Sequence, residues 1–197
     1  MPRLSRAESQ ARNRERVLEA ARELFLRDGY QATSLAAVAD AAGFSTGVVY
    51  SNFASKAELA LPVLREIQTD QFAALLTAIG PDKAPESRLD GLRRWTEDTM
   101  NSGWPRLELE FALDARTDTT LVAAESDRQR VAVDAVAEAI RVQLPGRLAE
   151  SLPVHALADA VLNLAYGIAV RRLIDPNVNA NSAIDLLRPL LAFLEPS

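Results

Sequence analysis

The sequence predicts an all-α fold of about nine helices, with an N-terminal three-helix domain followed by a C-terminal helical bundle. Three observations support this prediction. Apolar residues recur at helical spacing, no run shows the sustained alternation of a strand, and glycine and proline fall between the periodic runs. The 197 residues are 48% hydrophobic and 25% charged, which is typical of a globular protein with a well-formed core.

The first helix is predicted over residues 12–27, with Gly29 just past its end. Helical spacing places five apolar side chains on one face of it: Val17, Leu18, Ala21, Leu24 and Phe25. Residues 1–16 hold five arginines and two glutamates, a net charge of +3, which leaves −8 on the rest of a chain whose total is −5. This basic end is either a solvated arm or a segment that contacts nucleic acid.

Two short helices follow, separated by a glycine. Ser34 is the expected N-cap of the second helix, which ends at Gly43, and a third helix runs from after Ser45 to near Phe53. A glycine-containing turn between two short helices is typical of a helix-turn-helix, although the same arrangement also occurs as plain packing.

Ser55 and Glu58 have the spacing of a capping box and open a fourth helix that extends to about Ile79. Glycine and prolines at 80–85 interrupt the chain there. Five more helices are then predicted, over 86–101, 106–114, 119–144, 154–174 and 183–194. We place a DNA-binding domain at 1–55 and a helical ligand-binding and dimerisation domain at 56–197.

Composition argues against several classes of function. The chain has no cysteine and one histidine, so we expect no metal site, no cofactor and no histidine-based catalysis. Since we find no nucleophile–base pair or phosphate-binding loop, we do not expect an enzyme. No apolar run approaches the ~20 residues of a membrane span, and no secretory signal is evident, so we expect a cytoplasmic protein without a membrane partner.

The third predicted helix has a face suited to reading DNA. Val49 and Phe53 turn inward, which leaves small, nearly uncharged side chains outward. Hydroxyls, amides and methyls of this kind read base edges in a major groove. Lys56, at the start of the next helix, is placed to meet a phosphate.

These residues resemble the DNA-binding domain of TetR-family regulators over about 12–65. The resemblance is carried by Ala20-Ala21, Leu24-Phe25, Gly29-Tyr30, Thr33, Ser34, Ala42, Gly43, Gly47, Tyr50, Phe53, Lys56 and Glu58-Leu59. Asn52 departs from the family, which often has an aromatic residue or histidine there. The expected DNA contacts are Thr33, Ser34, Ser45, Thr46, Gly47, Val48, Tyr50, Ser51, Asn52 and Lys56.

Aromatic and polar residues of the C-terminal half are candidates for an effector site. Trp95, Trp104, Phe111 and Tyr166 either pack in the core or line a ligand cavity between helices. Asn163 lies one turn before Tyr166 in an apolar helix, where a ligand or a neighbouring helix would satisfy both.

Glu108 and Glu110 either pair with Arg116 or Arg93 or bind a cationic ligand; we favour the ion pair.

The last two predicted helices are the most apolar, and a broad apolar face on a terminal helix indicates a partner. The family resemblance implies a four-helix dimer interface, which we assign to Leu162, Leu173, Leu186, Leu187, Leu190, Leu191 and Leu194. It also implies a repressor that binds a palindromic double-stranded DNA operator as a homodimer and leaves it when a small-molecule effector tilts the fourth helix. The alternative is a helix-turn-helix regulator controlled by a protein partner or by no ligand.

Overall fold

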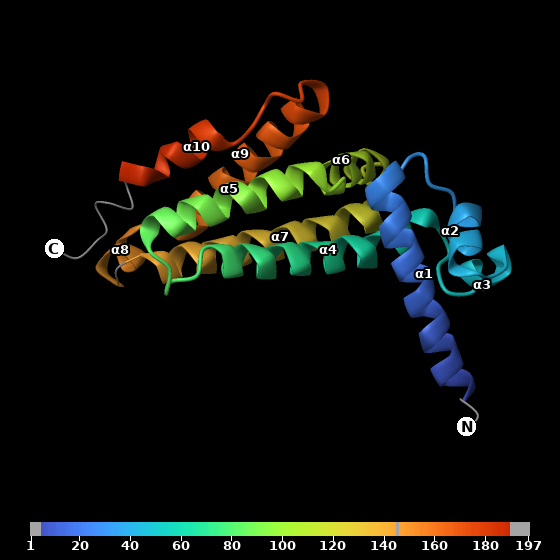
Figure 1. Ribbon diagram of the computed structural model, residues 1–197. Helices are drawn as coiled ribbons and strands as arrows, with labels where there is room; N and C mark the ends of the chain where they lie inside the picture. Colours follow the sequence, from blue (N-terminus) through green and yellow to red (C-terminus); the bar gives the residue numbers. More distant parts are fainter. Residues whose placement is uncertain (1–4, 145, 190–197) are drawn as a thin grey trace. The chain divides into compact units, whose positions relative to one another are not determined.

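The computed structural model describes residues 5–144 and 146–189, and every regular element within them is a helix (Figure 1). The ten helices are α1 (Arg6–Asp28), α2 (Leu35–Ala42), α3 (Thr46–Tyr50), α4 (Lys56–Ala78), α5 (Pro85–Asn101), α6 (Trp104–Ala115), α7 (Thr119–Gln143), α8 (Gly146–Ser151), α9 (Val154–Ile174) and α10 (Asn181–Asp185). The all-α prediction is confirmed. The short helix α8 was not expected, and the part of the predicted last helix beyond 189 lies outside the described residues.

The chain divides into two compact units. The first holds the residues up to Ile67 together with Arg106–Glu125, and the second holds Gln68–Pro105 and the residues from Ser126 on. Both α4 and α7 therefore contribute to each unit. This division by compactness differs from the functional domains 1–55 and 56–197, which remain a proposal.

Helix α1 begins six residues earlier than expected. The Ser5 hydroxyl accepts a hydrogen bond from the Glu8 N–H at 3.2 Å, and the Glu8 carboxylate accepts one from the Ser5 N–H at 2.7 Å. This reciprocal capping box satisfies two donors at the helix start. The prediction of a helix over 12–27 was therefore too short, and the arginines at 12, 14 and 16 belong to a helix rather than to a flexible arm.

The two short helices form as their end signals predict. Ser34 caps α2, its hydroxyl accepting from the Ala37 N–H at 3.1 Å. Gly43 follows α2 with φ +72°, a left-handed conformation that a side chain would strain. The third helix ends at Tyr50, earlier than the predicted Phe53. Ser55 caps α4 through the Glu58 N–H at 3.1 Å, but Glu58 accepts from Ala54, so the predicted capping box forms only in half.

The core of the first unit is built from α1 to α4 and α6. Its fully buried side chains include Val17, Phe25, Val38, Val49, Leu59, Val63, Leu64, Leu107 and Phe111. Tyr30 lies among them, with its ring centroid 5.8 Å from that of Phe25 and 5.6 Å from that of Phe111. Because α6 supplies Phe111, the turn before α2 packs on a segment about 80 residues further along the chain.

The second unit is a bundle of the remaining helical segments. A buried cluster of Val136, Ala137, Val154 and Ala158 joins α7 to α9, and Phe72 of α4 packs against it. Gln68 and Arg128, both buried, pair at 2.6 Å between the Gln68 carbonyl and the guanidinium. Among the described residues, no helix is both long and apolar enough to cross a membrane.

Candidate functional site

The exposed face of α3 and its flanks matches the predicted reading surface. Ser45, Thr46, Gly47, Tyr50 and Ser51 are exposed. Val48 and Asn52 are half-buried, and the Asn52 amide and the Ser51 hydroxyl each donate to the Val48 carbonyl at 2.8 Å. In the described part of the chain, the Thr46 and Tyr50 hydroxyls have no hydrogen-bond partner, so both remain available to a ligand.

The structure gives Thr33 a role inside the protein. Its side chain is buried, and its hydroxyl donates to the Gly29 carbonyl at 2.8 Å. A hydroxyl used in this way holds the turn between α1 and α2 and does not face outward. The prediction that Thr33 contacts DNA is therefore wrong for this conformation, whereas Ser34 next to it is exposed at the start of α2.

Lys56 is fixed against the same turn. Its ammonium donates to the Tyr30 carbonyl at 3.0 Å and to the Gln31 carbonyl at 3.4 Å, and lies 4.3 Å from the Tyr30 ring centroid. The side chain is half-buried. The lysine therefore ties the start of α4 to the turn, a role that the motif alone did not reveal.

Helix α6 binds the turn between α1 and α2 through three side chains spaced four residues apart. Asp114 accepts from the Tyr30 hydroxyl at 2.5 Å, Glu110 accepts from the Gln31 N–H at 2.7 Å, and Arg106 donates to the Arg27 carbonyl at 3.1 Å. Burial, followed by the bond to Asp114, raises the pKa of Tyr30 well above its usual value, so its phenol stays a donor.

Gly29, with φ +88°, permits this close approach. A Cβ there would lie 2.7 Å from Arg106 Nε and 2.8 Å from Glu110 Oε2. Glu110 also forms an ion pair with Arg106 at 3.8 Å, so the preference for an ion pair was right but the predicted partners, Arg93 and Arg116, were wrong. Glu108 is buried.

The five predicted effector residues are divided between the two units. Phe111 is fully buried against Tyr30 in the first unit, where it packs as a core residue. Trp95 and Trp104 are half-buried in the second, and the Trp95 indole donates to the Gln71 carbonyl at 3.0 Å.

Asn163 and Tyr166 both have protein partners, and for Tyr166 that partner lies on the neighbouring helix α7, one of the two predicted alternatives. Both are exposed on α9, where Asn163 donates to Asp159 at 3.3 Å and the Tyr166 hydroxyl is 3.0 Å from the Gln129 amide.

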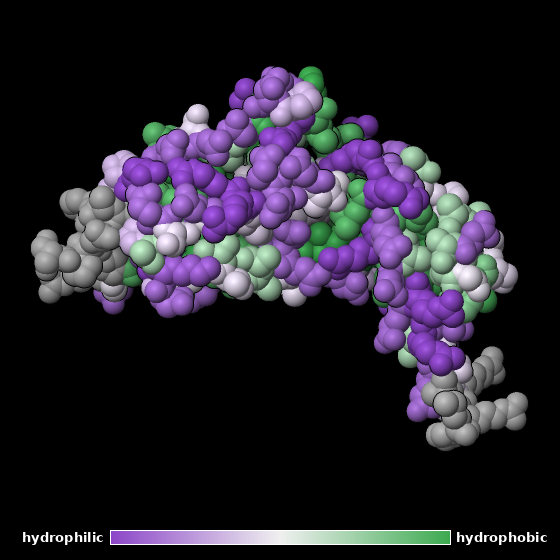
Figure 2. Space-filling model, in the orientation of Figure 1, coloured by the Kyte–Doolittle hydropathy of each residue, from purple (hydrophilic) through white to green (hydrophobic). Residues whose placement is uncertain are grey.

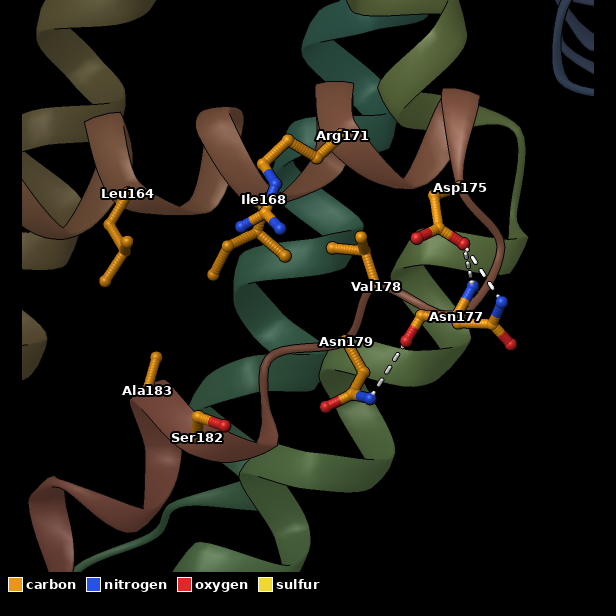
Figure 3. A pocket seen from close by; sticks show the side chains of 9 residues that line it. All are labelled: Leu164, Ile168, Arg171, Asp175, Asn177, Val178, Asn179, Ser182 and Ala183. Atoms are coloured by element: carbon orange, nitrogen blue, oxygen red, sulfur yellow. Dashed lines mark hydrogen bonds between the residues drawn. The ribbon is translucent and has the colours of Figure 1, made fainter.

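A pocket of about 460 Å³ lies between the carboxyl half of α9 and the segment that follows it (Figure 3). Its wall combines apolar and polar side chains: Leu164, Ile168, Val178 and Ala183 with Arg171, Asp175, Asn177, Asn179 and Ser182. None of the five predicted effector residues lines it. Asp175 accepts from both the backbone and side-chain N–H groups of Asn177, which folds the loop into a local turn.

Helix α9 exposes much apolar surface. Leu173 is exposed there, as are Leu186 and Leu187 beyond α10, whereas Leu162 is half-buried against the cluster that joins α7 and α9. The predicted interface residues Leu190, Leu191 and Leu194 lie outside the described residues. Further exposed apolar side chains on α9 are Leu157, Val161, Leu164, Val170 and Ile174. The sequence pattern did not single these out, because an apolar face looks alike whether it is buried or exposed.

Comparisons with known proteins bear on the family and the fold. Residues 17–63 match the family model described as bacterial regulatory proteins, tetR family. The HTH-type transcriptional repressor AcnR of Corynebacterium efficiens is 28% identical over 150 residues, 74% of this chain and 73% of the relative. The HTH-type transcriptional activator FasR of Mycolicibacterium smegmatis is 29% identical over 164 residues, 82% and 75% of the two chains.

Among solved structures, the multidrug binding protein EbrR complexed with imidazole superposes with a TM-score of 0.65 at 21% identity. The match covers 100% of this chain and 98% of that one. At this identity the likeness establishes the shared fold.

Replacing Lys56 by methionine tests its internal role. The variant keeps the aliphatic stem but loses both carbonyl hydrogen bonds and the contact with the Tyr30 ring. We expect the free energy of unfolding to fall by about 1–2 kcal/mol in chemical denaturation. Arg12→Met, which removes an exposed charge from α1, is the control and should leave stability unchanged. Equal stability of the two variants would contradict the structural role.

Proposed function

Because the chain belongs to the TetR family of bacterial regulatory proteins, which are DNA-binding transcriptional regulators, we propose that it is a repressor controlled by a small molecule. It binds a palindromic operator as a homodimer and releases the operator when the effector binds. The observation that carries the proposal is the exposed, nearly uncharged face of α3, where the Thr46 and Tyr50 hydroxyls have no partner among the described residues, beside a tightly held turn.

The contacts to DNA are assigned to the domain 1–55. A major groove admits one helix, and the short helix α3 presents hydroxyl, methyl and phenol groups to it. Gly47 carries no side chain, and a Cβ at this position would meet only the Ser45 hydroxyl oxygen, at 3.7 Å. The backbone of α3 is therefore open to close approach by DNA.

Dimerisation is assigned to α9 and the helix after it. Gly167 supports this assignment, because a Cβ built on it meets nothing within 4 Å in its own chain. A glycine inside a helix costs about 1 kcal/mol relative to alanine, and open space gives no reason for it within one chain. Close approach of a second α9, flanked by exposed Val170, Leu164 and Ile174, gives that reason.

The effector is assigned to the second unit. The support is the fold shared with EbrR, whose structure contains imidazole, and the position of both tryptophans in this unit. The proposal of a repressor rather than an activator rests on AcnR, which is a repressor. FasR, whose sequence identity to this chain is similar, is an activator. An activator is therefore the second candidate.

DNA recognition is tested by selection from a randomised duplex pool. We expect the protein to enrich inverted half-sites spaced by about 10 base pairs or a multiple of that. Tyr50→Ala should weaken binding to the selected duplex without changing stability, because Tyr50 is 57% exposed. Val131→Ala, also an exposed apolar residue, is the control and should bind as the parent does. If no sequence is enriched, operator recognition is refuted.

Assembly is tested at Gly167. A leucine there should convert the dimer to monomers in sedimentation at micromolar concentration, because its side chain occupies the space of the partner helix. Within one chain the same change meets open space and favours the helix. Gly146→Leu is the matched control, since a Cβ at Gly146 also has no neighbour within 4 Å. The interface is placed wrongly if both variants sediment as the parent does.

Effector control is tested by a thermal-shift screen of small apolar compounds that begins with imidazole. A compound that binds the folded protein raises its melting temperature, and it should change tryptophan fluorescence because Trp95 and Trp104 both lie in the second unit. The same compound should weaken binding to the selected duplex by roughly 1–3 kcal/mol. Stabilising compounds that leave DNA affinity unchanged would favour control by a protein partner instead.

A further inference from the structure

The amino-terminal half of α1 places two arginines against the helix-turn-helix. The Arg16 guanidinium carbon lies 4.5 Å from the Phe44 ring centroid, and the guanidinium donates to the carbonyl of Ala42, the last residue of α2, at 2.7 Å. The Arg14 guanidinium carbon lies 4.7 Å from the ring centroid of Phe53. Phe44 lies in the turn before α3 and Phe53 comes three residues after it, so each arginine contacts a residue that borders α3 in the sequence.

The two arginines differ in how many of their N–H donors remain available for a ligand. Arg16 uses one N–H to cap α2, which fixes it as part of the local structure. Arg14 is exposed and, in the described part of the chain, makes no hydrogen bond or ion pair, so all of its N–H donors remain available. Figure 2 shows this stretch of α1 as a hydrophilic surface, whereas paler residues of mixed hydropathy cover α2 and α3.

Stacking prepares Arg14 for an anion. An exposed arginine ordinarily loses side-chain rotamer entropy when it is immobilised. The Phe53 ring already restricts Arg14, and Phe53 is itself fixed because it is buried. The guanidinium edge then offers two parallel donors, the geometry that matches a phosphate.

We propose that Arg14 binds a phosphate of the DNA backbone beside the groove that α3 enters, and that Arg16 is a positioning residue that holds the turn before α3. The inference rests on the proposed DNA binding. Of the five arginines in the basic end, residues 1–16, it selects Arg14 as the phosphate contact. It also gives a reason for a chain with net charge −5 to keep Arg14, which has no ion pair within the described residues, next to the uncharged helix α3.

The test is a salt titration of binding to two duplexes, one selected from the randomised pool and one unrelated. For Arg14→Ala, the slope of log affinity against log salt should become shallower by about 0.9, the value for one lost phosphate contact. Affinity should fall by the same factor on both duplexes, since a phosphate carries no sequence information. Arg14→Lys should keep the slope but bind more weakly, because an ammonium cannot bind in bidentate fashion.

Arg27→Ala is the matched control. It removes the same charge from the other end of α1, where Asp28 already pairs with the guanidinium at 2.7 Å, so its slope should equal that of the parent. The inference is overturned if Arg14→Ala and Arg27→Ala share one slope, or if Arg14→Ala weakens only the selected duplex, which would mean a base contact. If the parent protein binds neither duplex, the proposed function itself fails.

Discussion

The turn between α1 and α2 is the constraint on which the first unit depends. Tyr30 lies at its centre, with its ring packed against those of Phe25 and Phe111. Its hydroxyl donates a hydrogen bond to Asp114, and its backbone carbonyl accepts one from Lys56. Thr33 closes the turn from inside through the Gly29 carbonyl. Three helices, α1, α4 and α6, therefore meet at one tyrosine, and contacts made by α4 and α6 hold the turn from which α2 begins. A reading helix of five residues is too short to be stable alone and requires such support.

This arrangement gives α6 a direct connection to the DNA-reading segment. Asp114, Glu110 and Arg106 lie one helical turn apart and all bind the turn or its edge. A shift of α6 along its axis would break all three contacts together, because a one-turn row of side chains matches its partners in only one register. The chain reaches α6 directly from α5, which lies in the second unit. Any rearrangement of α5 would therefore be linked covalently to the element that fixes the helix-turn-helix.

Local signals in the sequence predicted what local physics controls. Ser34 and Gly43 mark the ends of α2 because a cap and a left-handed glycine are determined by neighbouring residues. The early start of α1 was equally readable, since Ser5 and Glu8 form a capping box. The assignment of α6 to the first unit was not readable. The bond from Tyr30 to Asp114 spans 84 positions, and no local pattern records it.

Thr33 and Lys56, two of the predicted DNA contacts, show a different limit. Both have the residue types and spacing expected of DNA contacts, and a motif fixes type and position without fixing the direction of a side chain. Here each polar side chain donates to a backbone carbonyl of the turn instead. A buried carbonyl without a hydrogen-bond partner costs free energy, which favours this internal contact. Arg14 shows the reverse case, because its place beside α3 depends on the ring of Phe53, a neighbour in space 39 positions away.

The small reading face has a consequence for how binding is controlled. Hydroxyls and a phenol on one short helix discriminate between bases but supply little free energy, and phosphate contacts supply most of the affinity of such proteins. Under the proposed function, an acidic chain with few arginines available to phosphates would bind DNA weakly through one copy of the domain. Two copies held at a fixed spacing would bind far more tightly, since the second contact is made at high effective concentration. That gain would disappear when the spacing is wrong, so a modest change in the proposed dimer would release DNA without altering any residue that touches it.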